Sequence, residues 1–290
     1  MGRHDTTTTV LPASRISRAD LAALWTDAFS DYYVPGAVTV ESLEVFERSF
    51  DLDFAGSRIV VAEGRPVAFG MLGVRGRRGW VGGMGVIPSA RRRGHGERVM
   101  RALIEESQKR QFETLGLEVL VENEKAIPLY EALEFRILRK LEVWDRAARI
   151  EAPATPAAPA RELAIDEAAA RIAQLRPERA PWQRELEGVR SGFPDVRAMA
   201  SSDGRALIVF RVSPERIGIA ELAVDRGSRD AEADAAANAA LDQALATLFA
   251  AHPRRLARLL NLAEGDFVAA ALERAGAAVS HRQWEMELAL

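Results

Sequence analysis

The residues best suited to chemistry lie in the turn from Val86 to Gly96, where an apolar strand runs into three arginines and two glycines before a helix. Gly94 and Gly96 permit positive φ angles and let backbone N–H groups come close to an anion. The helix, expected from about Glu97, directs its partial positive charge at the same place. The turn therefore predicts a phosphate-binding site at the amides of residues 92–96, and a solvated basic turn is the alternative. The other side chains on this turn are Arg91, Arg92, Arg93 and His95.

A second pair of polar residues, Asn123 and Tyr130, follows a strand expected around residues 117–121. Seven residues span about two helical turns, so the two side chains share one face if Asn123 stands at the entrance of a helix. Asn is a good helix cap, and Pro128 is tolerated in a first helical turn. Both side chains can then face the phosphate turn. In the alternative, Asn123 is only a cap and Tyr130 only a core residue.

These two patterns together carry a family resemblance. The turn matches the motif (Gln/Arg)-x-x-Gly-x-(Gly/Ala) after a strand, and residues 117–135 match a strand that ends in Asn followed by a helix with Leu-Tyr. The stretch of residues 80–144 therefore resembles the GNAT acetyltransferases. Glu134 departs from the family pattern, because family members commonly have Gly before the Phe at this helix end.

The resemblance implies a binding mode for coenzyme A. Its diphosphate would lie on the amides of the turn, and its pantetheine arm would follow the strand before it as an added strand. A backbone N–H near Val86 would polarise the thioester carbonyl and stabilise the oxyanion that forms when an amine attacks directly. Tyr130 would protonate the departing thiolate, because the pKa of a phenol is about 10 and that of a thiol about 8.5. The implied cofactor-binding residues are Met84, Gly85, Val86, Arg91, Arg92, Arg93, Gly94, His95, Gly96 and Asn123.

The strand before the turn is rich in glycine, at positions 82, 83 and 85. These glycines permit the pantetheine arm to approach the backbone closely. In the alternative, they mark a β-bulge or a tight bend.

An acceptor amine needs a loop that binds its ammonium group and a base that removes a proton. The segment Asp31-Tyr32-Tyr33-Val34-Pro35 follows the first helix, where the acceptor loop of the resembling family lies, and combines a carboxylate with aromatic faces. Asp31 and Tyr32 are therefore candidate substrate residues, unless the segment is only a helix-ending turn with anchoring aromatics. His95 is expected to be a loop side chain rather than a base. Candidate bases are Glu118, Glu122 and Glu63.

Composition limits the remaining possibilities. The chain has 290 residues and no cysteine, which excludes disulfides and an acyl-cysteine intermediate and favours a reducing cytoplasm. Four scattered histidines do not suggest a metal site, so no metal is expected. Residues 1–150 hold 22 basic and 21 acidic residues, so the arginine cluster suits a small phosphorylated ligand better than a nucleic acid. No apolar run approaches the roughly 20 residues of a membrane span.

A Pro- and Ala-rich stretch at residues 151–160 indicates a semi-rigid linker between two domains, 1–150 and 161–290. In the first domain, apolar patterns predict helices over residues 18–29 and 40–50 and a hairpin about Glu63 with strands over residues 58–62 and 67–74. This order gives a sheet with flanking helices. The predicted fold class is α/β, with two tandem GNAT-like domains, each a mixed, mostly antiparallel sheet flanked by helices. The last strand, residues 283–290, is assigned to the second domain.

The second domain repeats the order of elements of the first, which predicts a diverged second copy of the fold. Asn123 pairs with Asn261 at an offset of 138 residues, and at that offset Glu232 and Asp234 replace the glycines of the phosphate turn. Carboxylates there would repel a diphosphate. Leu272 takes the place of the tyrosine after a four-residue insertion. This copy is expected to bind no cofactor and to complete the substrate cleft, pack against the first copy or mediate dimerisation.

The predicted function is that of an N-acetyltransferase, in which an acetyl group passes from acetyl-CoA, the co-substrate, to a primary amine of a small molecule or peptide. The first domain would be catalytic and the second accessory. The alternative is a catalytically silent sensor or scaffold protein that binds acyl-CoA. Neither nucleic acid nor a membrane is expected as a partner, a homodimer is an open alternative, and the expected compartment is the cytoplasm.

Overall fold

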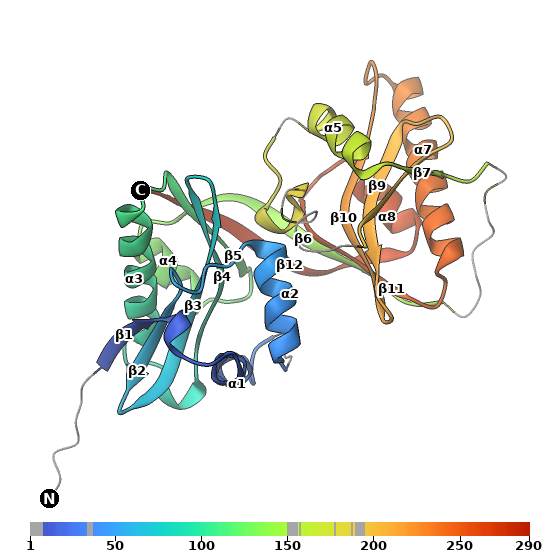
Figure 1. Ribbon diagram of the computed structural model, residues 1–290. Coiled ribbons are helices and arrows are strands. Elements are labelled where there is room, and N and C mark those ends of the chain that lie inside the picture. Colours follow the sequence, from blue (N-terminus) through green and yellow to red (C-terminus); the bar gives the residue numbers. More distant parts are fainter. Residues whose placement is uncertain are drawn as a thin grey trace, which may run out of the picture. The chain divides into compact units, whose positions relative to one another are not determined.

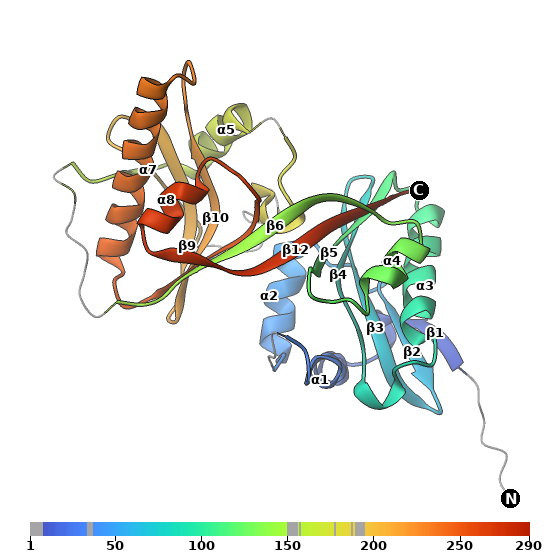
Figure 2. The ribbon, with the colours of Figure 1, turned by 180° about the vertical axis from the view of Figure 1, so that it is seen from behind.

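The computed structural model describes residues 8–33, 37–149, 156, 158–176, 178–186, 188 and 195–290. The chain divides into two compact units (Figures 1 and 2). Unit 1 comprises Met1–Leu138 together with Trp284–Leu290, and unit 2 comprises Arg139–Gln283.

The bounds of the units differ from the predicted domains, 1–150 and 161–290. Strand β6 (Arg136–Arg146) begins in unit 1 and continues in unit 2, and strand β12 (Ala277–Ala289) begins in unit 2 and ends in unit 1. A composition-based boundary cannot detect strands that are shared in this way. Residues 151–155 and 157 of the predicted linker lie outside the described residues.

Unit 1 is a mixed sheet with helices on both faces (Figure 1). Its elements are β1 (Thr8–Pro12), η1 (Ala13–Arg15), α1 (Arg18–Ala28), α2 (Val40–Phe50), β2 (Arg58–Ala62), β3 (Arg65–Arg75), β4 (Arg78–Val86), η2 (Pro88–Ala90), α3 (His95–Lys109), β5 (Thr114–Leu120) and α4 (Ile127–Ala132). Strands β1 to β4 are antiparallel neighbours, and β5 runs parallel to β4. Helices α3 and α1 cover opposite faces, since a Cβ at Gly70 would meet Val99 of α3 and one at Gly83 would meet Trp25 of α1.

Local sequence explains the main elements of unit 1. Ser17 caps α1 and Thr39 caps α2, each by accepting a hydrogen bond from a backbone N–H of the first turn. The predicted apolar face of α3 is confirmed, because Val99, Met100 and Leu103 are fully buried in the core cluster of unit 1. Burial therefore fixes the helix whose N-terminus follows the phosphate turn.

The end of β12 completes the sheet and the core of unit 1. It lies beside β5, and the N–H of Leu290 donates to the carbonyl of Glu113 at 3.0 Å. Met286 and Leu288 are buried in the same core cluster as the residues of α3. The assignment of this last strand to the second domain is therefore wrong for residues 284–290.

Unit 2 repeats the strand order of unit 1, with the first part of β12 followed by β6, β11, β10, β9, β8 and β7. Its further elements are β7 (Arg161–Leu163), α5 (Ile165–Leu175), η3 (Trp182–Arg184), β8 (Arg197–Ala200), β9 (Ala206–Val212), β10 (Arg216–Val224), α7 (Ala231–Ala251), β11 (Leu256–Ala263) and α8 (Ala269–Arg274). Strands β10 and β11 are parallel, as β4 and β5 are in unit 1. The predicted fold class, with a repeated mixed sheet, is confirmed.

Strand register corrects one equivalence between the two copies. The parallel ladder ends at the pair Val81 and Leu117 in unit 1 and at the pair Ile219 and Leu259 in unit 2. The offset therefore changes from 138 residues at the first strand to 142 at the second, because α7 is longer than α3. Asn261, inside β11, is not the counterpart of Asn123, which follows β5. Leu272 keeps its equivalence with Tyr130.

The departure at Glu134 has a backbone consequence, because this residue has φ +69° after α4. A left-handed conformation costs a residue with a side chain roughly 1–2 kcal/mol. Glycine removes this cost, but part of the gain is lost because glycine has more conformational entropy in the unfolded chain. We expect Glu134→Gly to raise the free energy of unfolding by about 0.5–1 kcal/mol, measured by urea denaturation. Glu134→Ala keeps the strain and is the control. Equal stabilisation by both variants would contradict this explanation.

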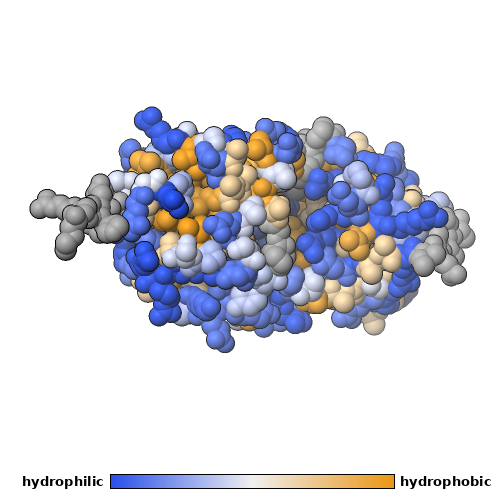
Figure 3. Space-filling view, turned by 90° about the horizontal axis from the view of Figure 1, so that it is seen from below, coloured by the Kyte–Doolittle hydropathy of each residue, from blue (hydrophilic) through white to orange (hydrophobic). Residues whose placement is uncertain are grey.

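The face seen in Figure 3 is mainly hydrophilic, with hydrophobic residues exposed in separate patches. Large apolar side chains that are exposed include Tyr33, Ile137, Leu138 and Leu256. Among the described residues, no helix combines the length and the apolar character needed to cross a bilayer.

Candidate active site

The phosphate turn adopts a backbone conformation suited to an anion. Arg92 has φ +65° and Gly94 has φ +77°, and alternation of this kind points successive N–H groups into a concavity. Helix α3 begins at His95, two residues before the predicted start, and its N-cap Gly94 provides no side-chain cap. Among the described residues, the N–H groups of residues 92–94 have no hydrogen-bond partner. The turn therefore fits a diphosphate.

The corresponding helix of unit 2, α7, has carboxylate side chains at its N-terminus. Asp230 is the N-cap of α7, and its carboxylate accepts a hydrogen bond from the N–H of Ala233 at 2.9 Å. Glu232 and Asp234 follow in the first turn, and Asp234 pairs with Arg226 at 2.8 Å. The predicted acidic character of this turn is confirmed, but the capping residue is Asp230, which the offset of 138 residues did not identify. A carboxylate holds the place that an incoming phosphate would need.

Strands β4 and β5 separate next to the phosphate turn, and we call the place where they part the slot. Their ladder ends at Val81 and Leu117, although β4 continues to Val86 and β5 to Leu120. The last residues of β4 pair with β3 on one edge, so their other edge faces the slot. A Cβ at Gly96 would lie 3.6 Å from side-chain atoms of Val86 and Leu129, which brings α3, α4 and the end of β4 together around the slot.

The glycines of β4 form a bulge and allow α1 to pack closely on the strand. Gly82 is the extra residue of a bulge, because Met71 pairs with Gly83 and the next residue of β3 pairs with Val81. A Cβ at Gly83 would lie 2.7 Å from the Trp25 ring. A Cβ at Gly85 would lie 2.9 Å from Ala28 of the same helix. The β-bulge interpretation is confirmed at Gly82, and the missing side chains of Gly83 and Gly85 leave room for α1.

Asn123 and Tyr130 come together through Tyr32 rather than through two turns of one helix. Helix α4 starts only at Ile127, with Ala126 as its N-cap, and the Asn123 side chain accepts from the Ala126 N–H at 3.3 Å in the preceding turn. The prediction that Asn123 caps the helix is therefore wrong by three residues. Its amide nitrogen instead donates to the Tyr32 hydroxyl at 3.4 Å.

Tyr130 lies in the core of unit 1 with 7% of its surface exposed. Burial raises the pKa of its phenol, and the nearby Tyr32 raises it further. Burial also raises the pKa of Tyr32, against the effect of the Asn123 hydrogen bond. All three tyrosines of the chain lie here, since Tyr33 donates from its hydroxyl to the Glu122 carbonyl at 2.9 Å. The raised pKa values keep the phenols of Tyr130 and Tyr32 protonated at neutral pH.

Arg91 and Asp31, predicted for the cofactor and the acceptor respectively, pair with each other. The two guanidinium Nη atoms lie 2.6 and 2.7 Å from the two oxygens of Asp31. Arg91 also donates to the carbonyls of Ala28 and Val86, both at 3.1 Å. The hydrogen bond from Arg91 lowers the pKa of Asp31. The side chains of Arg92 and Arg93, in contrast, are exposed.

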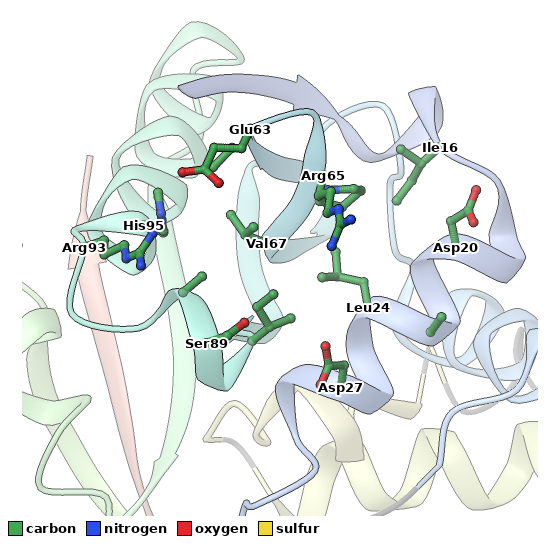
Figure 4. Close-up of a pocket in the computed structure, with 15 residues that line it drawn as sticks. Ile16, Asp20, Leu24, Asp27, Glu63, Arg65, Val67, Ser89, Arg93 and His95 are labelled. Atoms are coloured by element: carbon green, nitrogen blue, oxygen red, sulfur yellow. The ribbon is translucent and has the colours of Figure 1, made fainter. Parts of the chain in front are cut away.

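A groove of about 1240 Å³ flanks the phosphate turn (Figure 4). Arg93 and His95 stand on one side of it, Leu24 and Asp27 of α1 on the other, and Glu63 lies on the β2–β3 turn. His95 is 7% exposed, and burial, followed by the neighbouring Arg98 and Arg93, lowers its pKa. The residues that line the groove do not include Tyr130 or Asn123. The groove is thus distinct from the slot.

Of the three candidate bases, Glu118 lies nearest the slot. It follows Leu117, the last paired residue of β5, and accepts a hydrogen bond from the Trp80 indole N–H at 2.8 Å. Its side chain points away from the buried face formed by Leu117 and Val119, and therefore toward the side of the sheet that α1 covers. Glu63 lies in the groove, and Glu122 is exposed.

Among the described residues, no group of three or more histidine, aspartate or glutamate side chains is arranged to hold a metal ion. The coenzyme A assignment rests instead on the fit of the turn and the slot. Uncapped amides match a diphosphate, and the free edge of β4 matches the amides of a pantetheine arm. Sequence reasoning found the turn and missed the engagement of Arg91, because the ion pair joins residues sixty positions apart.

Comparisons with known proteins agree with this geometry. Residues 20–135 match the model of the acetyltransferase (GNAT) family. No curated protein sequence matches the chain significantly. A GCN5-related N-acetyltransferase from Sphaerobacter thermophilus has a TM-score of 0.74 at 18% identity, with 97% of this chain and 95% of that chain covered. A putative acetyltransferase from Pyrococcus horikoshii has a TM-score of 0.67 at 18% identity, with 100% and 93% covered.

A tandem GNAT protein from the clavulanic acid biosynthesis pathway has a TM-score of 0.65 at 17% identity, with 98% of both chains covered. Identities this low show the fold. Residues 20–135 therefore match a GNAT acetyltransferase domain, and the whole chain has the fold of GNAT structures that include a tandem GNAT protein.

Proposed function

We propose that the chain is an N-acetyltransferase that uses acetyl-CoA as co-substrate and acetylates a primary amine of a small molecule or peptide. The observation that carries this proposal is the uncapped N-terminus of α3 beside an open strand edge of β4. When bound, acetyl-CoA supplies an activated thioester. The amides of residues 92–96 hold its diphosphate, Met84, Gly85 and Val86 line its arm, and a backbone N–H near Val86 polarises the carbonyl.

Proton transfer falls to side chains at the slot. Tyr130 holds its proton on the phenolic oxygen, and its raised pKa keeps it protonated at neutral pH, as a general acid for a thiolate must be. Nearby, the Asn123 amide donates a hydrogen bond to the Tyr32 hydroxyl. Glu118 is the proposed base, acting directly or through a water, because it directly follows the last residue of β5 that pairs with β4.

The Glu118→Gln variant tests the base. Gln keeps an oxygen that accepts from the Trp80 indole, so the fold should be preserved. We expect turnover at pH 7 to fall about 100-fold. The deficit should shrink as the pH approaches about 10, the pKa of an alkyl amine, because the acceptor then loses its proton unaided. A pH-independent deficit would contradict the role of a base.

Unit 2 is proposed to be an accessory unit without a cofactor. Besides the Asp230 cap, its own segment η3 approaches β10 and β11, where the Arg184 guanidinium forms an ion pair with the buried carboxylate of Glu221. Arg176 lies 3.0 Å from the same carboxylate. Segment η3 and its charged contacts with Glu221 therefore lie where the slot would be in unit 2. One molecule of acetyl-CoA per chain is the expected stoichiometry.

The decisive experiment is a thiol-release assay of the purified chain with acetyl-CoA across amino acids, polyamines, aminoglycosides and peptides with free N-termini. Titration calorimetry with coenzyme A runs in parallel. Amine-dependent thiol release supports the proposal. Binding of coenzyme A without release for any amine would favour the acyl-CoA sensor. Absence of binding would reject the site altogether.

A further inference from the structure

Arg91 holds the segment after α1, residues 29–33, near the end of β4. Arg91 uses both Nη atoms for the Asp31 carboxylate, one of them also for the Ala28 carbonyl, and its Nε for the Val86 carbonyl. A bidentate guanidinium–carboxylate pair fixes direction as well as distance. A lysine ammonium cannot reproduce this fork. Arg91 therefore joins the end of β4, the end of α1 and the segment that follows it.

The same segment is also hydrogen-bonded to residues just beyond the end of β5. The Tyr33 hydroxyl donates to the Glu122 carbonyl at 2.9 Å, and the Tyr32 hydroxyl accepts from Asn123. Tyr32 and Tyr33 also pack edge to face, with ring centroids 5.3 Å apart. Residues 29–33 therefore cross the mouth of the slot and are held on both sides of it.

The geometry points to Arg91 as a positioning residue that couples occupancy of the phosphate turn to the order of residues 29–33. This inference rests on the proposed function, because it assumes that coenzyme A fills the slot. Arg91 directly precedes the amides expected to hold the diphosphate, and its side chain leaves that site. Coenzyme A that orders the phosphate turn also orders the Arg91 guanidinium. It thereby strengthens one of the contacts that hold residues 29–33, the segment against which the acceptor must bind.

Two consequences follow from this coupling. The guanidinium is engaged by protein groups, so it adds little to coenzyme A affinity itself. Binding of coenzyme A should, however, stabilise residues 29–33, and by linkage an ordered segment should favour coenzyme A by the same factor. The acceptor site is then complete only after the co-substrate has bound.

Amide hydrogen exchange with and without coenzyme A tests the inference without an identified acceptor. In the wild type, coenzyme A is expected to slow exchange in residues 29–33 about 10-fold, within the range typical of coupled sites. Arg91→Lys and Asp31→Asn should keep the dissociation constant for coenzyme A within about 5-fold and lose this protection. Arg92→Lys, a neighbouring arginine with an exposed side chain, should retain it.

Several outcomes would overturn the inference. A loss of affinity of 100-fold or more, on the order of Coulombic contact with a phosphate, in Arg91→Lys but not in Asp31→Asn would show that Arg91 binds the diphosphate directly. Unchanged protection in both variants would show that no coupling exists. Failure of the wild type to bind coenzyme A would instead reject the proposed function, on which the coupling depends. Asp31→Asn removes the pair without touching the turn, so it remains informative if Arg91→Lys folds poorly.

Discussion

Replacing Gly94 with Asp is expected to weaken acetyl-CoA binding roughly 1000-fold. The new carboxylate would stand at the N-cap position of α3, the position that Asp230 holds in α7, beside the amides that otherwise serve the ligand. Like charges 4 Å apart repel by about 4 kcal/mol at an effective dielectric constant of about 20, which is close to three powers of ten in affinity. Titration calorimetry measures the dissociation constant.

Gly94→Ala is the matched control. A Cβ at this position meets no atom within 4 Å, so Ala introduces only the strain of φ +77°. That strain, roughly 1–2 kcal/mol, limits the expected loss of affinity to about 30-fold even if all of it appears in binding. Equal losses in the two variants would show that backbone shape alone decides binding, and would contradict the assignment of an anion to this turn.

Tyr130→Phe is expected to lower kcat roughly 1000-fold while the dissociation constant for acetyl-CoA changes less than about 3-fold. Phenylalanine preserves the buried ring and its packing against Phe135 and removes only the proton donor. Because the pKa of Tyr130 is raised, its protonated form persists to higher pH than that of an exposed tyrosine. Deprotonation of this acid should therefore cause no loss of wild-type activity up to pH 10, where an ordinary phenol of pKa about 10 would be half ionised.

Tyr32→Phe is the comparison that identifies the donor. The two tyrosines are close enough to interact electrostatically, and burial raises both pKa values. Steady-state kinetics of the two variants, with calorimetry on each, separates turnover from binding. If Tyr32→Phe abolishes turnover and Tyr130→Phe does not, Tyr32 is the acid and the assignment of Tyr130 is wrong.

The phosphate turn was predictable from sequence because its signals are local. Glycines, arginines and a following apolar stripe occur within residues 91–104, the length of about four helical turns, and each acts on its neighbours. The same holds for α2 (Val40–Phe50) and for the hairpin at Glu63, whose predicted bounds agree closely with the structure. Helix α3 starts two residues before its predicted position, as expected where a glycine N-cap leaves the boundary loosely specified.

Contacts between distant residues were not predictable. The pair of Arg91 with Asp31 joins residues sixty positions apart, and composition alone assigned each of them to a different ligand. Tyr32 approaches Asn123 only because the sheet brings the end of α1 to the end of β5. The exchange of β6 and β12 between the units depends on strand pairing, which no local pattern specifies.

The pairing of β12 with β5 has a consequence for biosynthesis. Residues 284–290 close the core that carries Tyr130, yet all of Arg139–Gln283 is translated between Leu138 and these residues. A nascent chain on the ribosome can therefore assemble most of unit 2 while unit 1 still lacks a strand. Long-range closure of this kind is slow and leaves an open sheet edge exposed in the meantime, so unit 1 completes its sheet only after unit 2 has been translated.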